Sequence, residues 1–168
     1  MHQVKNGNLE LAGSLYDLYN VRIYNFFLRS CFDPALSKDM TQNVFLRMIR
    51  YRSSYNPDKP FKAWIYQVSR NILRDTMREK NRTVNEDLSV ITEMPEEGRI
   101  QEEQLAILNN SLKRLNEEDR QLLVFSKYEN MKYEEIASIM NISVANVKVK
   151  VHRAIRKLRE HYFELEQD

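Results

Sequence analysis

Chain-breaking residues are scarce in this sequence, and the long stretches between them repeat apolar residues at helical spacing. The chain has three glycines and four prolines, whereas a sheet needs turn residues between its strands. Leu, Glu, Lys and Arg, which favour helices, are abundant. The sequence therefore predicts an all-α fold.

The first half of the chain predicts three helices that form one small bundle. The first helix precedes Asp33 and carries leucines, an isoleucine and a phenylalanine at helical spacing. Asp33 and Pro34 combine a capping side chain with a proline in the first turn, so a second helix should begin there. The third helix, residues 61–82, follows a loop that two prolines bracket.

The second half predicts a four-helix domain that contains a helix-turn-helix. Asn116 stands before three acids, as an N-cap with acids in the first turn would. The stretch "YEEIASIMNIS", residues 133–143, predicts a short helix, with Asn141 in a left-handed turn and Ser143 capping the next helix. A short helix, a tight turn and a long helix have the spacing of a helix-turn-helix.

The helix that should start at Val144 has an apolar stripe on one side and cations elsewhere. At 100° per residue the stripe comprises Val144, Val147, Val151, Ala154, Ile155 and Leu158. A strand would explain less, because the alternation of valines fails at Arg153. Six cations and no acid lie between residues 144 and 159, which suits a recognition helix in duplex DNA; the alternative is an amphipathic hairpin with a solvated basic face. The candidate contacts to duplex DNA are Lys148, Val149, Lys150, His152, Arg153 and Arg156.

Charge is segregated along the chain. Residues 61–82 carry a net charge of +4 and residues 144–159 a net charge of +6, whereas residues 83–103 between them carry −6. The acidic segment has no sustained period and contains Pro95 and Gly98, which predicts a linker.

The first basic segment mixes aromatic residues with cations, a combination that suits unstacked single-stranded bases. Its Phe61 and Trp64 are better explained as residues of an ordinary hydrophobic core. Tyr55 and Asn56, in the proline-bracketed loop, are better candidates for contact with a flipped base.

Three blocks in this order resemble the second and fourth conserved regions of a bacterial sigma factor of the extracytoplasmic-function (ECF) type. They are "DMTQNVFLRMIRY", "FKAWIYQVSRNILRDTMREKNR" and "LKRLNEEDRQLLVFSKYENMKYEEIASIMNISVANVKVKVHRAIRKLRE". The resemblance runs from about Tyr16 to Arg159. It implies a region 2-like domain over residues 1–82, an acidic linker over residues 83–103 and a region 4-like domain over residues 104–168. It also implies a protein that binds core RNA polymerase, directs it to promoters and helps to open the duplex.

The resemblance assigns roles to particular positions. Contact with core polymerase would fall to Asp39, Gln42, Asn43, Phe45 and Leu46. The melted non-template strand of the minus-ten element would be held by Tyr55, Asn56, Lys62, Arg70, Asn71 and Arg74. The duplex minus-thirty-five element would be read through Lys148, Val149, His152 and Arg153. From residue type alone, Asp39 and Gln42 would be helical surface, and Phe45 and Leu46 would be buried.

The acidic linker would thread towards the active-site channel of the polymerase; a solvated tether is the alternative. The sequence departs from the family pattern at four positions: Lys132 stands where Ser or Thr normally caps the first helix of the helix-turn-helix, Ala145-Asn146 replaces Gly-Thr, and Val149 replaces Ser. The first change would cost a cap of about 1 kcal/mol. The departures bear on which promoter is read.

Other classes of protein explain fewer features. A two-domain regulator that binds duplex DNA without polymerase would not explain residues 39–46, which would have no binding partner. A tyrosine recombinase would need His-x-x-Arg, which neither His152 nor His161 provides. We therefore expect no catalytic residues, no metal and no cofactor.

No apolar run is long enough to cross a bilayer and the N-terminus lacks a secretory signal, so we expect a cytoplasmic protein without membrane insertion. The single Cys31 is expected to be a small buried residue.

Proteins of the ECF type commonly have an anti-sigma factor, so the resemblance implies an anti-sigma factor as a further partner of this chain.

Overall fold

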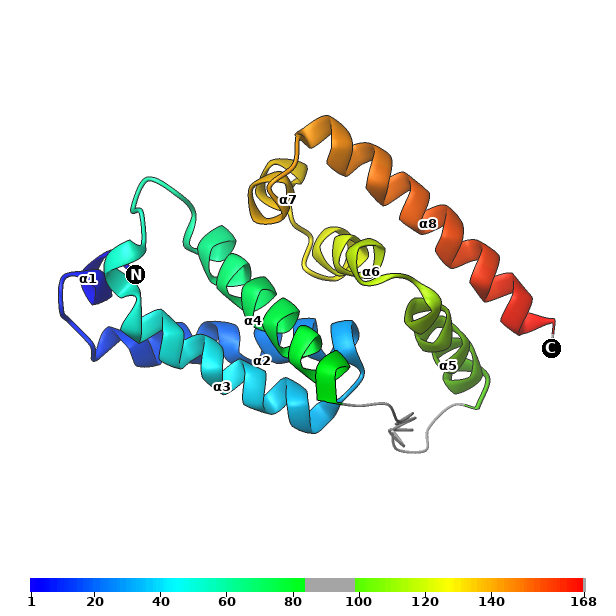
Figure 1. Ribbon diagram of the computed structural model, residues 1–168, viewed down its shortest axis with the longest axis horizontal. Helices are drawn as coiled ribbons and strands as arrows, with labels where there is room; N and C mark the ends of the chain where they lie inside the picture. Colours follow the sequence, from blue (N-terminus) through cyan, green and yellow to red (C-terminus); the bar gives the residue numbers. More distant parts are fainter. Residues whose placement is uncertain (84–98, 168) are drawn as a thin grey trace. The chain divides into compact units, whose positions relative to one another are not determined.

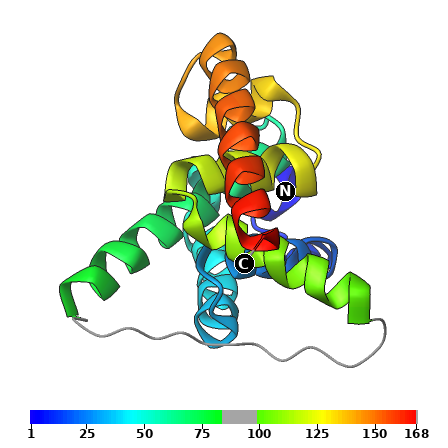
Figure 2. The same cartoon turned by 90° about the vertical axis from the view of Figure 1, so that its right-hand side faces the viewer.

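All regular secondary structure that the computed structural model describes, in residues 1–83 and 99–167, is helical (Figure 1). The predicted all-α fold is therefore confirmed. The chain divides into two compact units, one built mainly from helices α1–α4 and the other mainly from α5–α8. Figure 2 shows the same helices from a second direction.

The N-terminal unit is a three-helix bundle with a short additional helix at its start. Its elements are α1 (His2–Lys5), α2 (Leu11–Cys31), α3 (Pro34–Arg50), the 3₁₀ turn η1 (Arg52–Ser54) and α4 (Phe61–Thr83). Helix α3 packs on both α2 and α4, and Phe26 of α2 meets Tyr66 of α4 edge-on, with ring centroids 5.7 Å apart. Both rings are fully buried. The sequence predicted α2, α3 and α4 but not α1.

At the corner between α2 and α3, the cap and the first turn of α3 form as the sequence predicts. Phe32 ends α2 in the left-handed conformation, with φ of 56°. The backbone N–H of Leu36 donates to Asp33 Oδ1 at 3.0 Å, and Pro34 occupies the first turn. The second oxygen of Asp33 lies 3.4 Å from Lys80 Nζ, which ties the end of α4 to this corner.

The C-terminal unit contains α5 (Arg99–Arg114), α6 (Glu117–Leu123), the π-helical turn η2 (Val124–Tyr128), α7 (Tyr133–Met140) and α8 (Val144–Glu166). Asn116 caps α6 by accepting from the Asp119 N–H at 2.8 Å. Asn141 adopts the left-handed conformation, with φ of 55°. Ser143 caps α8 by accepting from the Asn146 N–H at 3.2 Å. The predicted helix-turn-helix is therefore formed by α7 and α8.

Two details of the sequence interpretation were wrong. Val144, assigned to the buried stripe of α8, is 42% exposed because it lies in the first turn, before the helix reaches its packing partners α5 and α6. Residues 99–103, assigned to the acidic linker, are the start of α5, since no glycine or proline follows Gly98 to stop a helix there. The rest of that linker, residues 84–98, lies outside the described residues.

The cap at Asp33 should have a measurable effect on stability. Asp33→Ala removes the acceptor for Leu36 N–H and the partner of Lys80, so we expect the free energy of unfolding to fall by about 1 kcal/mol. The only tryptophan, Trp64, lies in this unit and reports its unfolding in urea through fluorescence. Asp39→Ala, an exposed carboxylate on the same helix, is the matched control and should leave the midpoint unchanged. Equal midpoints for the two variants would contradict the capping role.

Candidate nucleic-acid interface

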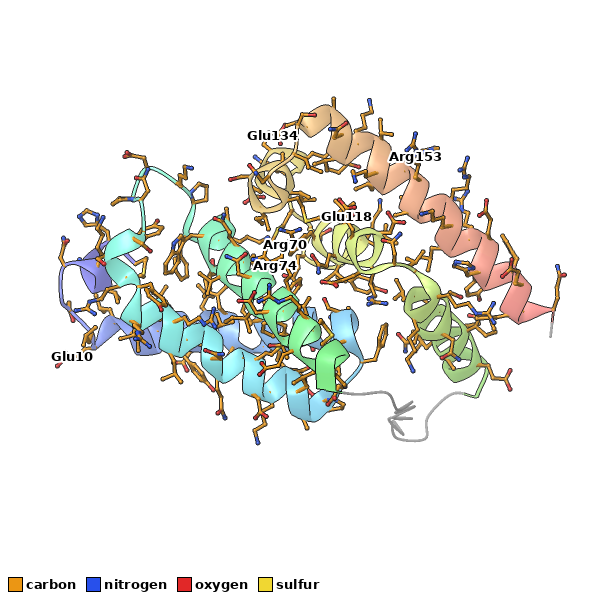
Figure 3. The ribbon with its side chains drawn as sticks, viewed as in Figure 1. Glu10, Arg70, Arg74, Glu118, Glu134 and Arg153 are labelled. Carbon is orange, nitrogen blue, oxygen red and sulfur yellow. The ribbon has the colours of Figure 1, made fainter. Side chains whose placement is uncertain are left out.

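Helix α8 turns one continuous basic face to solvent. Val147, Val151 and Ala154 are buried at 1% exposure or less, and α8 packs through them against α5 and α6. The opposite face is exposed and carries Val149, His152, Arg153 and Arg156, and the exposed Lys148 lies at its edge. Arg153 projects away from the helix in Figure 3. Cations around a small apolar patch can bind phosphates and base edges together.

Lys150, the sixth predicted contact on α8, lies on a different side of the helix. Its Nζ is 2.8 Å from Glu118 Oε1 at the start of α6. About two helical turns further along α8, Lys157 Nζ lies 2.6 Å from Asp119 Oδ2. These two lysines therefore join α8 to α6, and the ammonium group of Lys150 is paired with Glu118.

Asp119 is the centre of a polar network that the sequence did not predict. It is 7% exposed, its N–H is capped by Asn116, and its Oδ2 accepts from both Asn116 Nδ2 at 2.8 Å and Lys157 Nζ. The acids after Asn116 were interpreted as first-turn acids only. Their second role depends on α8, 38 residues away from Asp119 in the chain.

The start of α7 has a substitute for the missing Ser or Thr cap. The backbone N–H of Lys132 donates to Glu135 Oε2 at 2.9 Å. This is the reciprocal half of a capping box, in which a glutamate three residues on satisfies the N–H before the helix. The helix-turn-helix therefore keeps one of its two usual terminal hydrogen bonds.

The loop between η1 and α4 has an aromatic base and an exposed tip. Tyr55 is 6% exposed, its hydroxyl donates to the Lys59 carbonyl at 2.9 Å, and its ring lies 5.5 Å from that of Trp64 and 6.0 Å from that of Phe61. Asn56, the next residue, is exposed and accepts from the Asp58 N–H at 3.0 Å. Of the two predicted base contacts in the loop, Asn56 therefore lies at the surface and Tyr55 beneath it.

Helix α4 gathers most of its predicted strand-binding residues on one face. At about 100° per residue, Arg70, Asn71 and Arg74 fall within roughly 100° of one another, whereas Lys62 lies about 80° round from Arg70. The side chains of Arg70 and Arg74 project from the same side of α4 in Figure 3. Arg74 is held loosely by Asp75, with 3.8 Å between Nη2 and Oδ1.

The predicted polymerase contacts on α3 also share a face, with one exception. Asp39, Gln42 and Leu46 are exposed, Leu46 to 68%, and Asn43 beside them is half-buried. Phe45 is 6% exposed and packs edge-on against Tyr16 of α2, with centroids 4.8 Å apart.

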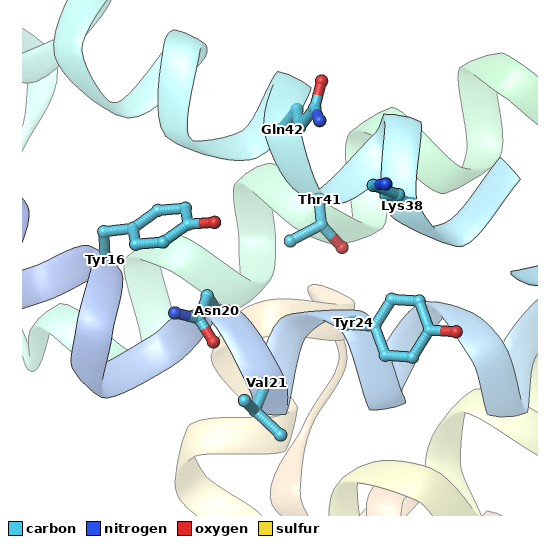
Figure 4. Close-up of a pocket in the computed structure, with 7 residues that line it drawn as sticks. All are labelled: Tyr16, Asn20, Val21, Tyr24, Lys38, Thr41 and Gln42. Carbon is cyan, nitrogen blue, oxygen red and sulfur yellow. The ribbon is translucent and has the colours of Figure 1, made fainter. Parts of the chain in front are cut away.

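A groove runs beside this face between α2 and α3 (Figure 4). Its volume is about 260 Å³. It is lined by Tyr16, Asn20, Val21, Tyr24, Lys38, Thr41 and Gln42. The face of α3 is therefore next to a shallow hollow with mixed polar and apolar walls.

Other kinds of site find little support in the part of the chain that the structure describes. No group of three or more His, Cys, Asp or Glu residues there is arranged to hold a metal ion. None of the described helices is long and apolar enough to span a membrane. Cys31 is half-buried beside Ser37, and burial raises the pKa of its thiol, which keeps it protonated and unreactive at neutral pH.

Comparisons with known proteins agree with this geometry. The family model for sigma-70 region 2 matches residues 15–83, and that for sigma-70 region 4 matches residues 105–158. The ECF RNA polymerase sigma factor SigM of Bacillus subtilis is 31% identical over 152 residues, covering 88% of this chain and 93% of that protein. The RNA polymerase sigma factor CarQ of Myxococcus xanthus is 28% identical over 169 residues, covering 99% of this chain and 97% of that protein.

A solved structure has the same fold. CnrH, in complex with the cytosolic domain of CnrY, superposes with a TM-score of 0.74 at 23% identity, covering 95% of this chain and 92% of that one. The chain belongs to the ECF family of RNA polymerase sigma factors. It directs polymerase to particular promoters, and the alternative of a regulator that acts without polymerase is not favoured.

The Asp119–Lys157 pair should stabilise the C-terminal unit. Lys157→Met removes the cation from a carboxylate that is 11% exposed, and we expect a loss of roughly 1–2 kcal/mol, at the low end because Lys157 is itself half-exposed. Urea unfolding followed by helical circular dichroism measures it. Arg159→Met, an exposed cation on the same helix, should change stability by less than about 0.5 kcal/mol. Similar losses in both variants would show that the pair has no special role.

Proposed function

We propose that three surfaces divide the work of promoter recognition. The region 2-like domain, residues 1–82, binds core polymerase through α3 and holds the melted minus-ten strand through the loop at Asn56 and the face of α4. The region 4-like domain, residues 104–168, reads the duplex minus-thirty-five element through α8. The single observation that supports this division best is the outward basic face of α8, opposite a buried stripe.

Helix α8 is proposed to lie in the major groove. Arg153 is suited to a guanine edge or a phosphate, Val149 to the methyl group of a thymine, and Lys148 and Arg156 to phosphates. His152 adds a surface contact beside them. Lys150 is proposed as a phosphate contact that first exchanges Glu118 for DNA.

The opened strand needs a different surface, with positive charge and exposed polar groups at a rigid loop. Asn56 would contact the flipped base, with Tyr55 supporting the loop from below. Arg70, Asn71 and Arg74 would follow the backbone along α4, and Lys62 would act nearer the start of that helix. Strand opening needs no ATP where such contacts offset the few kcal/mol of unstacking.

The face of α3 is proposed as the contact with core polymerase. Leu46 offers an exposed apolar side chain, with the polar Gln42 and Asn43 one helical turn before it and Asp39 two turns before it on the same face. Phe45 would act indirectly, by holding α3 against Tyr16. The acidic residues between α4 and α5 would occupy a basic channel of the polymerase, a role that rests on their charge alone.

We propose no catalytic activity for the chain itself, which works as a subunit of the polymerase. A protein inhibitor of the anti-sigma class is a further proposed partner. The solved structure of the sigma factor RpoE from Bartonella quintana is a complex with the anti-sigma factor NepR, and it superposes with a TM-score of 0.73 at 18% identity, covering 89% of this chain and 94% of that one.

Reconstituted transcription tests the division of labour. With core polymerase and a cognate promoter, Asn71→Ala combined with Arg74→Ala should slow strand opening about tenfold and leave binding of the minus-thirty-five duplex unchanged. Arg153→Ala should weaken duplex binding about tenfold. Permanganate reactivity measures opening, and a gel shift of the holoenzyme measures binding.

The control for these variants is Arg22→Ala, which removes an exposed cation from α2. It should change neither quantity. If the double variant opened DNA normally and lost only duplex affinity, the proposed role of α4 would be wrong.

The pairing of Lys150 predicts a change in salt dependence. Glu118→Gln weakens the hold on Lys150, so the holoenzyme should bind promoter DNA a few-fold more tightly at low salt, with a steeper fall in affinity as salt rises. Glu117→Gln, whose carboxylate accepts from Gln121 instead, removes the same charge and is the control. Identical salt slopes in both variants would reduce the effect to net charge and contradict the exchange.

A further inference from the structure

We propose that helix α1 is a positioning element for minus-ten recognition, and that Val4 and Lys5 hold the loop of residues 51–60 in the shape that captures an unstacked base. This inference rests on the proposed role of that loop. It concerns residues that lie before the region 2 match, which begins at residue 15. Figure 1 shows α1, in dark blue, beside the turn that follows α3.

Helix α1 is held by tertiary contacts. A helix of four residues has no stability of its own, because nucleation costs more than its single turn returns. Val4 is fully buried, and α1 contacts both α2 and η1. The position of α1 is therefore fixed by the same body of protein that carries the loop.

The contact with the loop is a charged hydrogen bond to its backbone. Lys5 Nζ donates to the carbonyl oxygen of Tyr55 at 2.8 Å, across 50 residues of sequence. Charge-assisted hydrogen bonds are about twice as strong as neutral ones. This bond reaches the residue directly before Asn56, the exposed residue proposed to meet the flipped base.

The hydrogen bond from Lys5 also constrains Asn56, because the peptide bond between Tyr55 and Asn56 is planar. The carbonyl of Tyr55 and the N–H of Asn56 belong to one planar unit, so fixing the oxygen also fixes the direction of that N–H. On the other side, the Tyr55 hydroxyl is bonded to the Lys59 carbonyl, and the Lys59 N–H donates to the Asn56 carbonyl at 3.1 Å. Lys5 therefore orients the peptide through which the tip leaves Tyr55, at one of its two connections to the aromatic base.

The experiment uses the full-length chain in reconstituted holoenzyme. Lys5→Met keeps the length of the side chain but removes the donor, and we expect opening of a duplex promoter to slow about tenfold, since small displacements at a recognition site have effects of this size or larger. Core-polymerase affinity and binding of the minus-thirty-five duplex should stay unchanged. Lys5→Arg restores a donor and should recover most of the rate, and Gln3→Ala, an exposed change on the same helix, should behave as wild type.

Two further measurements separate positioning from stability and from the role of the loop itself. Thermal unfolding is recorded for each variant: if Lys5→Met and Lys5→Arg lose activity equally and in proportion to their melting temperatures, α1 is only structural and the inference is wrong. Asn56→Ala is assayed in parallel. Slow opening by Asn56→Ala with normal opening by Lys5→Met would overturn the inference alone, whereas normal opening by both would overturn the proposed role of the loop as well.

Discussion

The burial of a single apolar stripe fixes the rotation of each interface helix about its own axis. In α8 the stripe of Val147, Val151 and Ala154 is buried against α5 and α6, so Val149 and Arg153 must point to solvent. A rotation of α8 by one residue would exchange buried valines for cations, at a cost in free energy that no surface contact offsets. The direction of the basic face is therefore set by the core behind it.

The charges of the C-terminal unit serve two purposes that compete with each other. Lys150 and Lys157 neutralise Glu118 and Asp119 within the unit, whereas the cations on the outward face have DNA as their proposed partner. The nearly buried Asp119 needs its lysine, because an ionised carboxylate removed from water without a partner is costly. The more exposed Glu118 can release its lysine at little cost. Burial thus separates a structural ion pair from an exchangeable one.

The N-terminal unit combines a rigid base with polar groups at the surface in a similar way. Tyr55, Phe61 and Trp64 pack against one another below the loop, and Asn56 lies at its tip. A loop that is ordered before it meets its ligand loses less conformational entropy on binding. In our proposal this order, to which α1 contributes, helps the contacts to a flipped base to offset the cost of unstacking it.

The sequence by itself determined the helices other than α1, their caps and the outward direction of Val149, because these depend on interactions over three or four residues and on a 100° period. The caps at Asp33, Asn116 and Ser143 and the left-handed turn at Asn141 all form as predicted. Only the tertiary structure decided that Lys150 and Lys157 pair with α6, that Tyr55 is buried, and that Lys5 holds the Tyr55 carbonyl. The bonded pairs among these join residues 32, 38 and 50 positions apart. Their geometry depends on how the helices pack, which no local spacing in the chain specifies.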